Sequence, residues 1–128
     1  RYIVSCSFCD IVAGKNPANI VFESEHCLAF TPLEMEVDGH LLVIPKQHAS
    51  HLLDAPTTLL ADVMAFVKYV CSEVSSQYGF TGFNILNATG VSAQQSIDHL
   101  HFHIMPRRAG DGIDAWPDLG KGNNIYAR

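Results

Sequence analysis

Short apolar runs separated by polar turns dominate the first half of the chain and predict strands at 20–22, 27–30 and 41–45. The stretch 57–78 has instead the helical period, with one broad apolar stripe and Gly79 at the position of a C-cap glycine. Two more strands are predicted at 82–87 and 97–105, and a short helical turn at 6–14. Because strands follow one another with few helices between them, we expect an α+β fold with an antiparallel sheet.

Three histidines, His99, His101 and His103, lie two residues apart in the last predicted strand. Side chains at i, i+2 and i+4 share one face of a strand, so the three imidazoles are expected on one side of the sheet. The apolar residues between them, Leu100 and Phe102, would then point to the other side. Because the pKa of imidazole lies near neutrality, such a row can attack a substrate, donate protons or bind a metal ion.

Composition places the chain among ordinary globular proteins and argues against two classes of partner. It has 128 residues, 48% hydrophobic and 16% charged, so we expect a single domain over 1–128 with an irregular tail at about 107–128. The net charge is −5 and the basic residues are scattered, which argues against a nucleic-acid polymer as ligand. No apolar run approaches the roughly 20 residues of a membrane span. Four cysteines without a visible secretory signal favour a reducing, cytoplasmic location.

Three segments resemble the histidine triad (HIT) superfamily of nucleotide hydrolases and transferases, in particular its bacterial-type, Hint-like phosphoramidases. The most specific is Gln-Ser-Ile-Asp-His-Leu-His-Phe-His-Ile at 95–104, which is similar to the family signature. Gly-His-Leu-Leu-Val-Ile-Pro-Lys-Gln-His at 39–48 and Phe-Cys-Asp-Ile-Val at 8–12 resemble the family's second block and its opening. The resemblance extends from Cys6 to Arg108. It implies a HIT-like fold, with a five-stranded antiparallel sheet, one long and one short helix, and a homodimer joined across the long helix and an adjoining strand.

The resemblance assigns the chemistry to the histidine row and its neighbours. His101 matches the family nucleophile, whose imidazole nitrogen attacks the α-phosphorus and forms a covalent nucleotidyl-histidine. His103, protonated beside the phosphate, would stabilise the negative charge on the phosphoryl oxygens. His40 matches a histidine that orients the nucleophilic ring, and we expect it to be neutral because burial disfavours imidazolium. The expected catalytic residues are His101, His103, His99, Gln95, Ser96 and His40.

The loop before the histidine row resembles the family's phosphate-binding loop. Ser96 and Gln95 match residues that hydrogen-bond phosphate oxygens and approach the leaving group. Capping of the loop is the alternative role for Ser96, and a solvated turn position is the alternative for Gln95. Gln94 stands at a position where relatives commonly have glycine.

A purine nucleotide is the small-molecule partner that the resemblance implies. Phe8 and Ile11, one helical turn apart, match positions that sandwich the base, with Leu33 beside them, although core packing would explain the same residues. Asn87 resembles an asparagine near the α-phosphate. Pro32 stands where relatives carry an aspartate that accepts both ribose hydroxyls, so we expect the ribose to be bound by backbone groups or by Glu34, or more weakly.

Cys6 and Cys9 have the spacing of a metal knuckle, and a structural Zn²⁺ ion needs two further ligands. The candidates are His48 and His99, and the set resembles a subset of the family in which two cysteines and two histidines bind zinc. His51 is an alternative to His48, and a disulfide or two free thiols are alternatives to zinc. The remaining two cysteines lie on apolar faces and are expected in the core.

These observations predict a nucleotide hydrolase or transferase that cleaves at the α-phosphate of nucleoside 5′-phosphoramidates or related AMP conjugates. A dinucleoside polyphosphate hydrolase is the alternative within enzymes. A nucleotide-binding HIT module with little turnover is the alternative from another class. Two or three histidines on one strand could also hold a catalytic zinc ion with an open position. Metal content, and the effect of chelation on the folded protein, separate these hypotheses.

Overall fold

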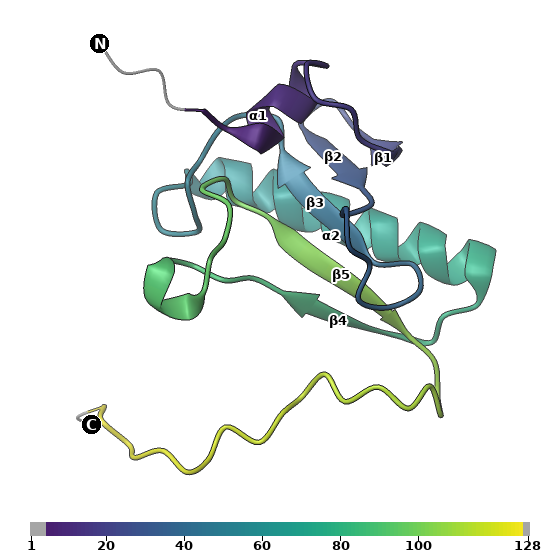
Figure 1. Cartoon of the computed structure of the whole chain (residues 1–128), viewed down its shortest axis with the longest axis vertical. Coiled ribbons are helices and arrows are strands. Elements are labelled where there is room, and N and C mark those ends of the chain that lie inside the picture. Colours follow the sequence, from purple (N-terminus) through teal and green to yellow (C-terminus); the bar gives the residue numbers. More distant parts are fainter. Residues whose placement is uncertain (1–4, 127–128) are drawn as a thin grey trace.

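The computed structural model describes residues 5–126 and contains one five-stranded antiparallel sheet with helices on its faces (Figure 1). The strands lie in the order β1-β2-β3-β5-β4. The predicted fold class, an α+β arrangement with five antiparallel strands, one long helix and one short helix, is therefore confirmed. The elements in chain order are α1 (Ser7–Val12), β1 (Ile20–Glu23), β2 (Cys27–Phe30), β3 (Leu41–Pro45), α2 (Thr57–Tyr78), β4 (Gly82–Leu86), a 3₁₀ turn η1 (Val91–Ala93) and β5 (Phe102–Arg107).

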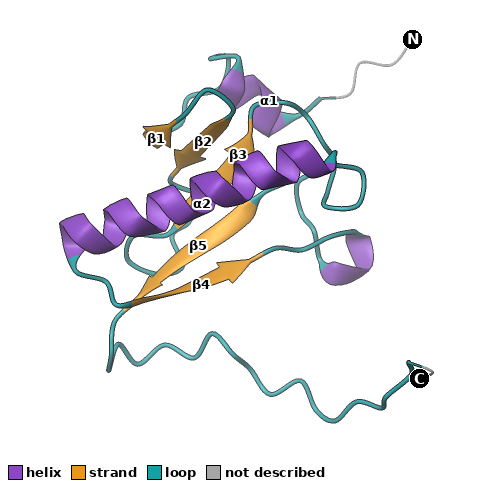
Figure 2. Cartoon of the chain, turned by 180° about the vertical axis from the view of Figure 1, so that it is seen from behind, coloured by secondary structure: helices purple, strands orange, loops and turns teal. Residues whose placement is uncertain are grey.

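The long helix α2 crosses one face of the sheet, as Figure 2 shows from behind, and the short helix α1 packs on the opposite face. Strand β3 is buried on both sides: Leu41 and Val43 belong to the core beneath α2, while Leu42 and Ile44 belong to the core beneath α1. This double burial explains why β3 is a continuous apolar run in the sequence. It also defines two sides of the sheet, an α2 side and an α1 side.

Helix α2 spans Thr57–Tyr78, the range that the sequence predicts. Gly79 ends it in the left-handed conformation, with φ of 75°, and its N–H donates to the carbonyl of Ser75 at 2.8 Å. A side chain at Gly79 would be strained in this conformation, which explains glycine at the cap. The buried stripe that packs on the sheet consists of Leu59, Val63, Phe66, Val67, Val70 and Val74.

The last strand differs from its predicted range, because β5 begins at Phe102 rather than near residue 97 and continues to Arg107. On one side its neighbour β4 ends at Leu86, which pairs with His103, so β4 offers no partner further toward residue 97, and the last residue of β3 paired with β5 is Val43, opposite Phe102. The preceding segment nevertheless keeps the predicted alternation. Leu100 is fully buried on the α2 side, and the three histidines lie on the other side.

Gly39 brings the segment before β3 close to the end of β5. Its φ is +78°, and a Cβ atom there would lie 3.2 Å from Cγ of Pro106. A side chain would therefore be strained and crowded at once. Glycine at this position allows the next residue, His40, to enter the sheet fully buried beside β5.

The segment 108–126 contains no helix or strand and runs beneath the open edge of β4 (Figures 1 and 2). Arg107 anchors its start, since the guanidinium binds both carboxylate oxygens of Asp111 at 2.7 and 2.8 Å and the side-chain oxygen of Asn84 at 2.8 Å. Beyond this anchor the apolar side chains lie in solvent, and Trp116 is 82% exposed.

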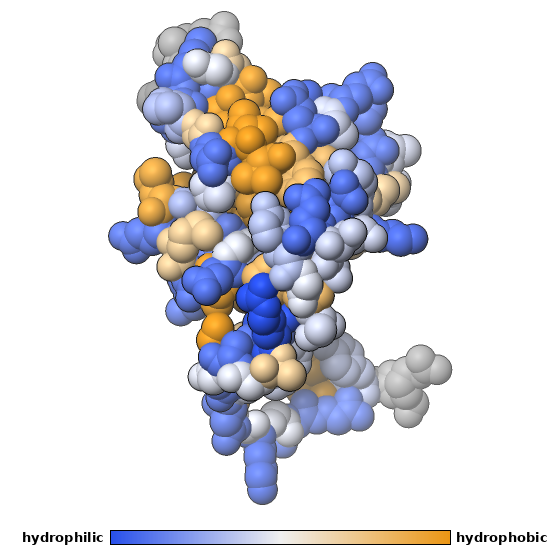
Figure 3. Space-filling model, turned by 90° about the vertical axis from the view of Figure 1, so that its right-hand side faces the viewer, coloured by the Kyte–Doolittle hydropathy of each residue, from blue (hydrophilic) through white to orange (hydrophobic). Residues whose placement is uncertain are grey.

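The side of the molecule at the C-terminal end of α2 carries apolar side chains in its upper half, above a mostly hydrophilic lower part (Figure 3). Ile20 and Val21 of the edge strand β1 are among the exposed apolar residues. Among the described helices, none is long and apolar enough to cross a membrane.

Candidate functional site

The second and third histidines of the row lie on the α1 side of the sheet, with His40 behind them. His101 is 6% exposed and His40 is 2% exposed, while His103 is partly buried. The rings of His101 and His103 are 5.4 Å apart between centroids, and those of His40 and His103 are 5.2 Å apart. Three imidazoles therefore form one contiguous group, as their spacing in the sequence and the burial of His40 predict.

A backbone carbonyl fixes which nitrogen of His101 carries the proton. Nδ1 of His101 lies 2.7 Å from the carbonyl oxygen of His99, and a carbonyl can only accept a hydrogen bond. Nδ1 is therefore the protonated nitrogen, and Nε2 of the neutral ring keeps its lone pair. The side chain of Asn87 supports this arrangement, because its Nδ2 donates to the carbonyl of His101 at 2.9 Å. The carbonyl of His101, which lies just before β5 and beyond its last pair with β4, thus accepts a hydrogen bond from a side chain.

A second hydrogen-bond chain fixes the tautomers of His40 and His103. The backbone N–H of Glu36 donates to Nδ1 of His40 at 3.2 Å, so the proton of a neutral His40 lies on Nε2. That Nε2–H donates to Nδ1 of His103 at 3.0 Å. The remaining nitrogen of His103, Nε2, is therefore a hydrogen-bond donor. Through His40, the backbone N–H of Glu36 thus fixes which nitrogen of His103 carries the proton.

Burial keeps both of these histidines neutral. It lowers the pKa of His40, and burial together with His101 and His40 lowers the pKa of His103 to about 4. The expectation of a neutral His40 agrees with this direction. The lowered pKa of His103 favours a neutral ring in the protein alone, which offers a directed N–H. The expectation of a protonated His103 concerns a ring beside a phosphate, and it stays a prediction.

Phe8 of α1 packs edge-to-face against the histidine row. Its ring centroid lies 5.3 Å from that of His101, 5.9 Å from that of His99 and 5.4 Å from that of Phe30. The sequence left two roles open for Phe8 and Ile11, base binding and core packing. Both are buried in the core on the α1 side, and both also line a hollow beside the histidines.

This hollow measures about 710 Å³ and lies between α1, the loop that follows it and the end of β2. Leu42, the cross-strand partner of His103, lies in its wall, which places the hollow next to the row. Pro32 and Leu33 also line it, and Leu33 stands at the mouth with its side chain fully exposed. Its remaining lining residues are Ser7, Phe8, Ile11, Asn16, Pro17, Ala18, Asn19, Phe30, Thr31 and Ile97.

Sequence reasoning missed the polar groups of this hollow. Asn16, Asn19 and Thr31 lie in its wall, where Pro32 cannot accept hydrogen bonds through its side chain. Asn16 and Asn19, on either side of Pro17 directly after the helix of Phe8, could have indicated polar loop groups at this place, since asparagine and proline are typical of turns. The position of Thr31 followed from no local pattern.

The loop residues expected to bind phosphate have different positions. The side chain of Gln95 accepts from the N–H of Gly90 at 2.8 Å and donates to the carbonyls of Ser50 and Ile97 at 2.6 and 2.9 Å. Its amide is therefore occupied by the backbone of the loop. Ser96 is exposed, and the amide of Asn87 is held by His101 and by the hydroxyl of Thr89 at 2.8 Å.

The first histidine of the row points away from the other two, into a cluster with Cys6, Cys9 and His48. One ligand atom from each of these four residues lies within 4.8 Å of the others. Nδ1 of His99 is 3.4 and 3.5 Å from the two sulfur atoms and 3.2 Å from Nδ1 of His48. His51 is not in the cluster, because its Nδ1 accepts from the N–H of Leu53 at 3.2 Å.

The donor set fits a tetrahedral Zn²⁺ ion. Bonds of about 2.0–2.1 Å to nitrogen and about 2.3 Å to sulfur give tetrahedral edges of roughly 3.3 Å between nitrogens and roughly 3.6 Å from nitrogen to sulfur. The three separations from Nδ1 of His99 are close to these edges, and all four donor atoms lie within 4.8 Å of one another. In addition, Nε2 of His99 donates to the carbonyl of Pro45 at 2.9 Å, so its Nδ1 is unprotonated and faces the sulfurs.

The knuckle itself is formed locally by α1. The sulfur of Cys6 accepts from the backbone N–H of Cys9 at 3.2 Å and so caps the helix with the side chain that faces the cluster. Burial and the neighbouring Cys6 raise the pKa of the Cys9 thiol to about 11. A bound divalent cation would reverse this shift, because a coordinating thiol is deprotonated by the metal.

Comparison with known proteins identifies the family. A family model described as HIT domain matches residues 13–110. The chain belongs to the HIT family. It is 43% identical over 107 residues to an uncharacterized HIT-like protein of Methanocaldococcus jannaschii, covering 84% of this chain and 82% of that protein. It is 37% identical over 117 residues to an adenosine 5′-monophosphoramidase of Schizosaccharomyces pombe, covering 89% of this chain and 84% of that protein.

The fold is shared with solved structures of the HIT family. A Zn-bound histidine triad family protein from Mycobacterium smegmatis superposes with a TM-score of 0.82 and is 34% identical, with 91% of this chain and 84% of that one covered. The matched HIT segment begins at residue 13, after α1. The metal knuckle and Phe8 are therefore contributed by a helix that lies outside the segment matched by the family model.

Proposed function

We propose that this HIT-family protein is a nucleotide hydrolase that cleaves nucleoside 5′-phosphoramidates, or related AMP conjugates, at the α-phosphate. The observation that carries the proposal is the hydrogen bond from Nδ1 of His101 to the carbonyl of His99, at 2.7 Å. It leaves Nε2 of His101 unprotonated and able to attack phosphorus. The adenosine 5′-monophosphoramidase among the relatives has the corresponding activity in its name.

The reaction runs in two displacements at phosphorus. In the first, the lone pair of Nε2 of His101 forms a bond to the α-phosphorus, and the bond from phosphorus to nitrogen breaks with its electron pair going to the nitrogen, which takes a proton from solvent and leaves as the amine. The carbonyl of His99 faces the Nδ1–H and stabilises the positive charge that the ring gains. In the second, water attacks phosphorus and gives up a proton to solvent, the bond to His101 breaks with its electron pair returning to Nε2, and a nucleoside monophosphate leaves.

His103 supplies a donor to the phosphoryl oxygens in both steps. Its Nδ1 accepts from His40, so its Nε2–H is directed outward and needs no reorientation when charge develops. The nucleoside part of the substrate fits the hollow of about 710 Å³ beside the row. The buried ring of Phe8 separates this hollow from the metal cluster.

We also propose that Cys6, Cys9, His48 and His99 hold a structural Zn²⁺ ion. Four protein donors leave no open position, so such an ion would supply folding energy and hold α1, and would not activate water. This arrangement favours the structural role over the catalytic zinc site that was the alternative from the sequence.

A single trapping experiment tests the nucleophile and the reaction class. The protein is mixed briefly with adenosine 5′-phosphoramidate, quenched in denaturant and analysed by peptide mass spectrometry. We expect an added AMP mass on the peptide that contains His101, and none in His101→Ala. The metal content of both proteins is measured in parallel to show that the variant keeps its fold and its cluster.

Three results would contradict the proposal. Release of AMP without any adduct on wild type, and with full activity in His101→Ala, would mean direct attack by water. Neither adduct nor AMP release, with AMP still bound tightly, would favour a nucleotide-binding HIT module. Diadenosine polyphosphate as the better substrate, in the same assay, would favour the polyphosphate hydrolase.

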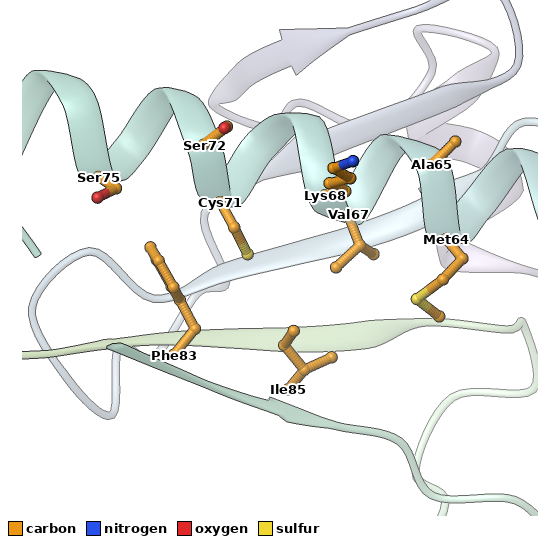
Figure 4. A pocket seen from close by; sticks show the side chains of 9 residues that line it. All are labelled: Met64, Ala65, Val67, Lys68, Cys71, Ser72, Ser75, Phe83 and Ile85. Atoms are coloured by element: carbon orange, nitrogen blue, oxygen red, sulfur yellow. The ribbon is translucent and has the colours of Figure 1, made fainter. Parts of the chain in front are cut away.

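We propose further that two copies of the chain associate through α2 and β4. A groove of about 580 Å³ lies between these elements, and its wall is mainly apolar, with Phe83 and Ile85 facing the helix (Figure 4). Met64 and Ile85 are nearly half exposed there, and β4 is an edge strand of the sheet. Light scattering should give twice the chain mass of 14.0 kDa, and a monomer would refute this association.

A further inference from the structure

His99 belongs to the metal cluster and to the catalytic group at the same time. Its imidazole Nδ1 lies 3.4 Å from the sulfur of Cys6, while its backbone carbonyl accepts the hydrogen bond from His101 that frees the nucleophilic nitrogen. The ring is also fixed from the other side by the carbonyl of Pro45. A shift of the backbone of His99 that took its ring out of the cluster would therefore also move the carbonyl that orients His101.

Phe8 makes a second connection between the two sites. It lies between Cys6 and Cys9 in the sequence, and its ring packs on both His99 and His101. Helix α1 has only six residues, which is too short to be stable in water by itself. Its position therefore depends on the cysteine cluster and on its buried side chains, and the same side chains form the wall of the nucleoside hollow.

The segment after His48 makes a third connection. The carbonyl of Ala49 accepts from the N–H of Leu100 at 2.7 Å, and the carbonyl of Ser50 accepts from the amide of Gln95 at 2.6 Å. Gln95 in turn holds the N–H of Gly90 at 2.8 Å. The two residues that follow a metal ligand thus hold both ends of the segment that leads into the histidine row.

We propose that His99, Phe8 and the segment 48–50 couple the metal site to the nucleotide site, so that metal binding and AMP binding strengthen each other. The physical basis is ordering. α1 and the segment 95–100 must be held in one arrangement for either ligand, and the ligand that binds second meets an already ordered site. The proposal rests on the proposed function, because it takes AMP as the ligand of the catalytic group.

Linkage makes the effect measurable from both sides. The dissociation constant of AMP is measured by calorimetry on zinc-loaded protein and on protein stripped with a chelator, with circular dichroism to establish that the stripped form is folded. We expect AMP to bind at least about fivefold more weakly to the stripped protein, the lower end of typical coupling between sites. Zinc affinity, measured by competition with a chromophoric chelator, must rise by the same factor when AMP is present.

Two cysteine variants provide a matched comparison. Cys9→Ser removes a cluster ligand and should bind AMP as weakly as stripped wild type, whether or not zinc is added. Cys71→Ser changes a cysteine on α2, outside the cluster, and should keep the full effect of zinc. An equal loss of zinc dependence in both variants would contradict coupling through α1.

If the metal-free protein unfolds, the coupling is tested on metal-bound protein instead. Co²⁺ is placed in the cluster, and its visible absorption, which reports the geometry of the ligands, is followed while AMP is added. We expect a saturable shift with the dissociation constant of AMP. A spectrum that stays constant at saturating AMP, or equal AMP affinity with and without zinc, overturns the coupling and leaves the proposed function intact. AMP that binds neither form overturns both.

Discussion

The two ends of the histidine row have the same side chain and different chemistry. At one end, Nε2 of His99 donates to the carbonyl of Pro45, so a bare Nδ1 faces two sulfurs. At the other end, Nδ1 of His103 accepts from His40, so an N–H is directed outward. One is arranged as a metal ligand and the other as a hydrogen-bond donor. The partner of the second nitrogen decides the role of each ring.

The two ends share one electrostatic property. Burial is the main cause that lowers the pKa of His99 and of His103. A neutral ring is required in both places, because a metal ligand needs a lone pair and a relay through His40 needs an acceptor. The environment that suits a metal site therefore also suits a site for nucleophilic attack, and a short row of histidines can supply both.

The largest expected effect is on hydrolysis, and a substitution at His101 should change it without changing the metal cluster at the His99 end. His101→Ala should lower hydrolysis by at least about 10³-fold, since removal of a nucleophile leaves only the binding and electrostatic contributions. Zinc per chain should stay unchanged, because His101 contributes no atom to the cluster. Steady-state kinetics and metal analysis on the same preparation measure both quantities.

Cys9→Ser is the reciprocal variant. It should lose the metal and, at a free zinc concentration about 100 times the dissociation constant, about 3 kcal/mol of unfolding free energy, while hydrolysis falls far less than in His101→Ala. A loss of metal in His101→Ala, or a loss of hydrolysis in Cys9→Ser as large as that of the nucleophile variant, would mean that the two ends are one site.

The next effect concerns the pH dependence of stability at the His103 end. The pKa of His103 is about 4 in the folded protein and 6.5 in the reference state, so the folded form binds fewer protons between these values. The free energy of unfolding should therefore fall as the pH decreases from 6.5 to 4, by up to about 1.4 kcal/mol per pH unit for this histidine. Urea denaturation at a series of pH values measures the slope.

His103→Gln isolates this contribution, because a glutamine oxygen can accept from His40 and its NH₂ group can donate, without titrating. Its slope should be smaller than that of wild type over the same range. The lowered pKa of His40 acts in the same direction and remains in both proteins, as does any loss of metal at low pH. Equal slopes would show that His103 is not held neutral by the fold.

Local patterns in the sequence predict the scaffold of both sites well. The range of α2, the antiparallel order of short strands and the alternation of histidines with buried apolar residues all depend on side-chain periodicity, which local sequence records. The set of Cys6, Cys9, His48 and His99 came from the resemblance to the family, because its members are separated by up to 93 residues.

Hydrogen-bond partners were much less predictable. Gln95 and Asn87 are expected near the phosphate, which stays a prediction, but the hydrogen bonds of their amides to the backbone around Ser50 and His101 were not foreseen. The lowered pKa of His103 could not be predicted for a similar reason, since its burial and its contact with His40 arise only when β3 and β5 lie together. An amide or an imidazole has several possible partners, and tertiary structure selects among them.

The smallest expected effect is a change in stability, and it concerns the loop before the histidine row, whose backbone is held by the side chain of Gln95. The preceding residue, Gln94, is the only non-glycine residue among the described ones with a positive φ, at 69°. This conformation costs roughly 1–2 kcal/mol for a residue with a Cβ atom, so glycine would suit this position better. Gln94→Gly should therefore raise the unfolding free energy by up to about 1 kcal/mol, after the larger chain entropy of glycine in the unfolded state is subtracted.

Ala93→Gly is the matched control, one residue earlier, in η1, with a φ outside the positive region. Here the substitution adds only freedom to the unfolded chain and should lower the unfolding free energy by up to about 1 kcal/mol. Urea denaturation of both variants gives the two signs. If Gln94→Gly were destabilising as well, the side chain of Gln94 would be contributing more than its backbone costs. The side chain of Gln94 would then stabilise the loop before the histidine row, as the side chain of Gln95 does.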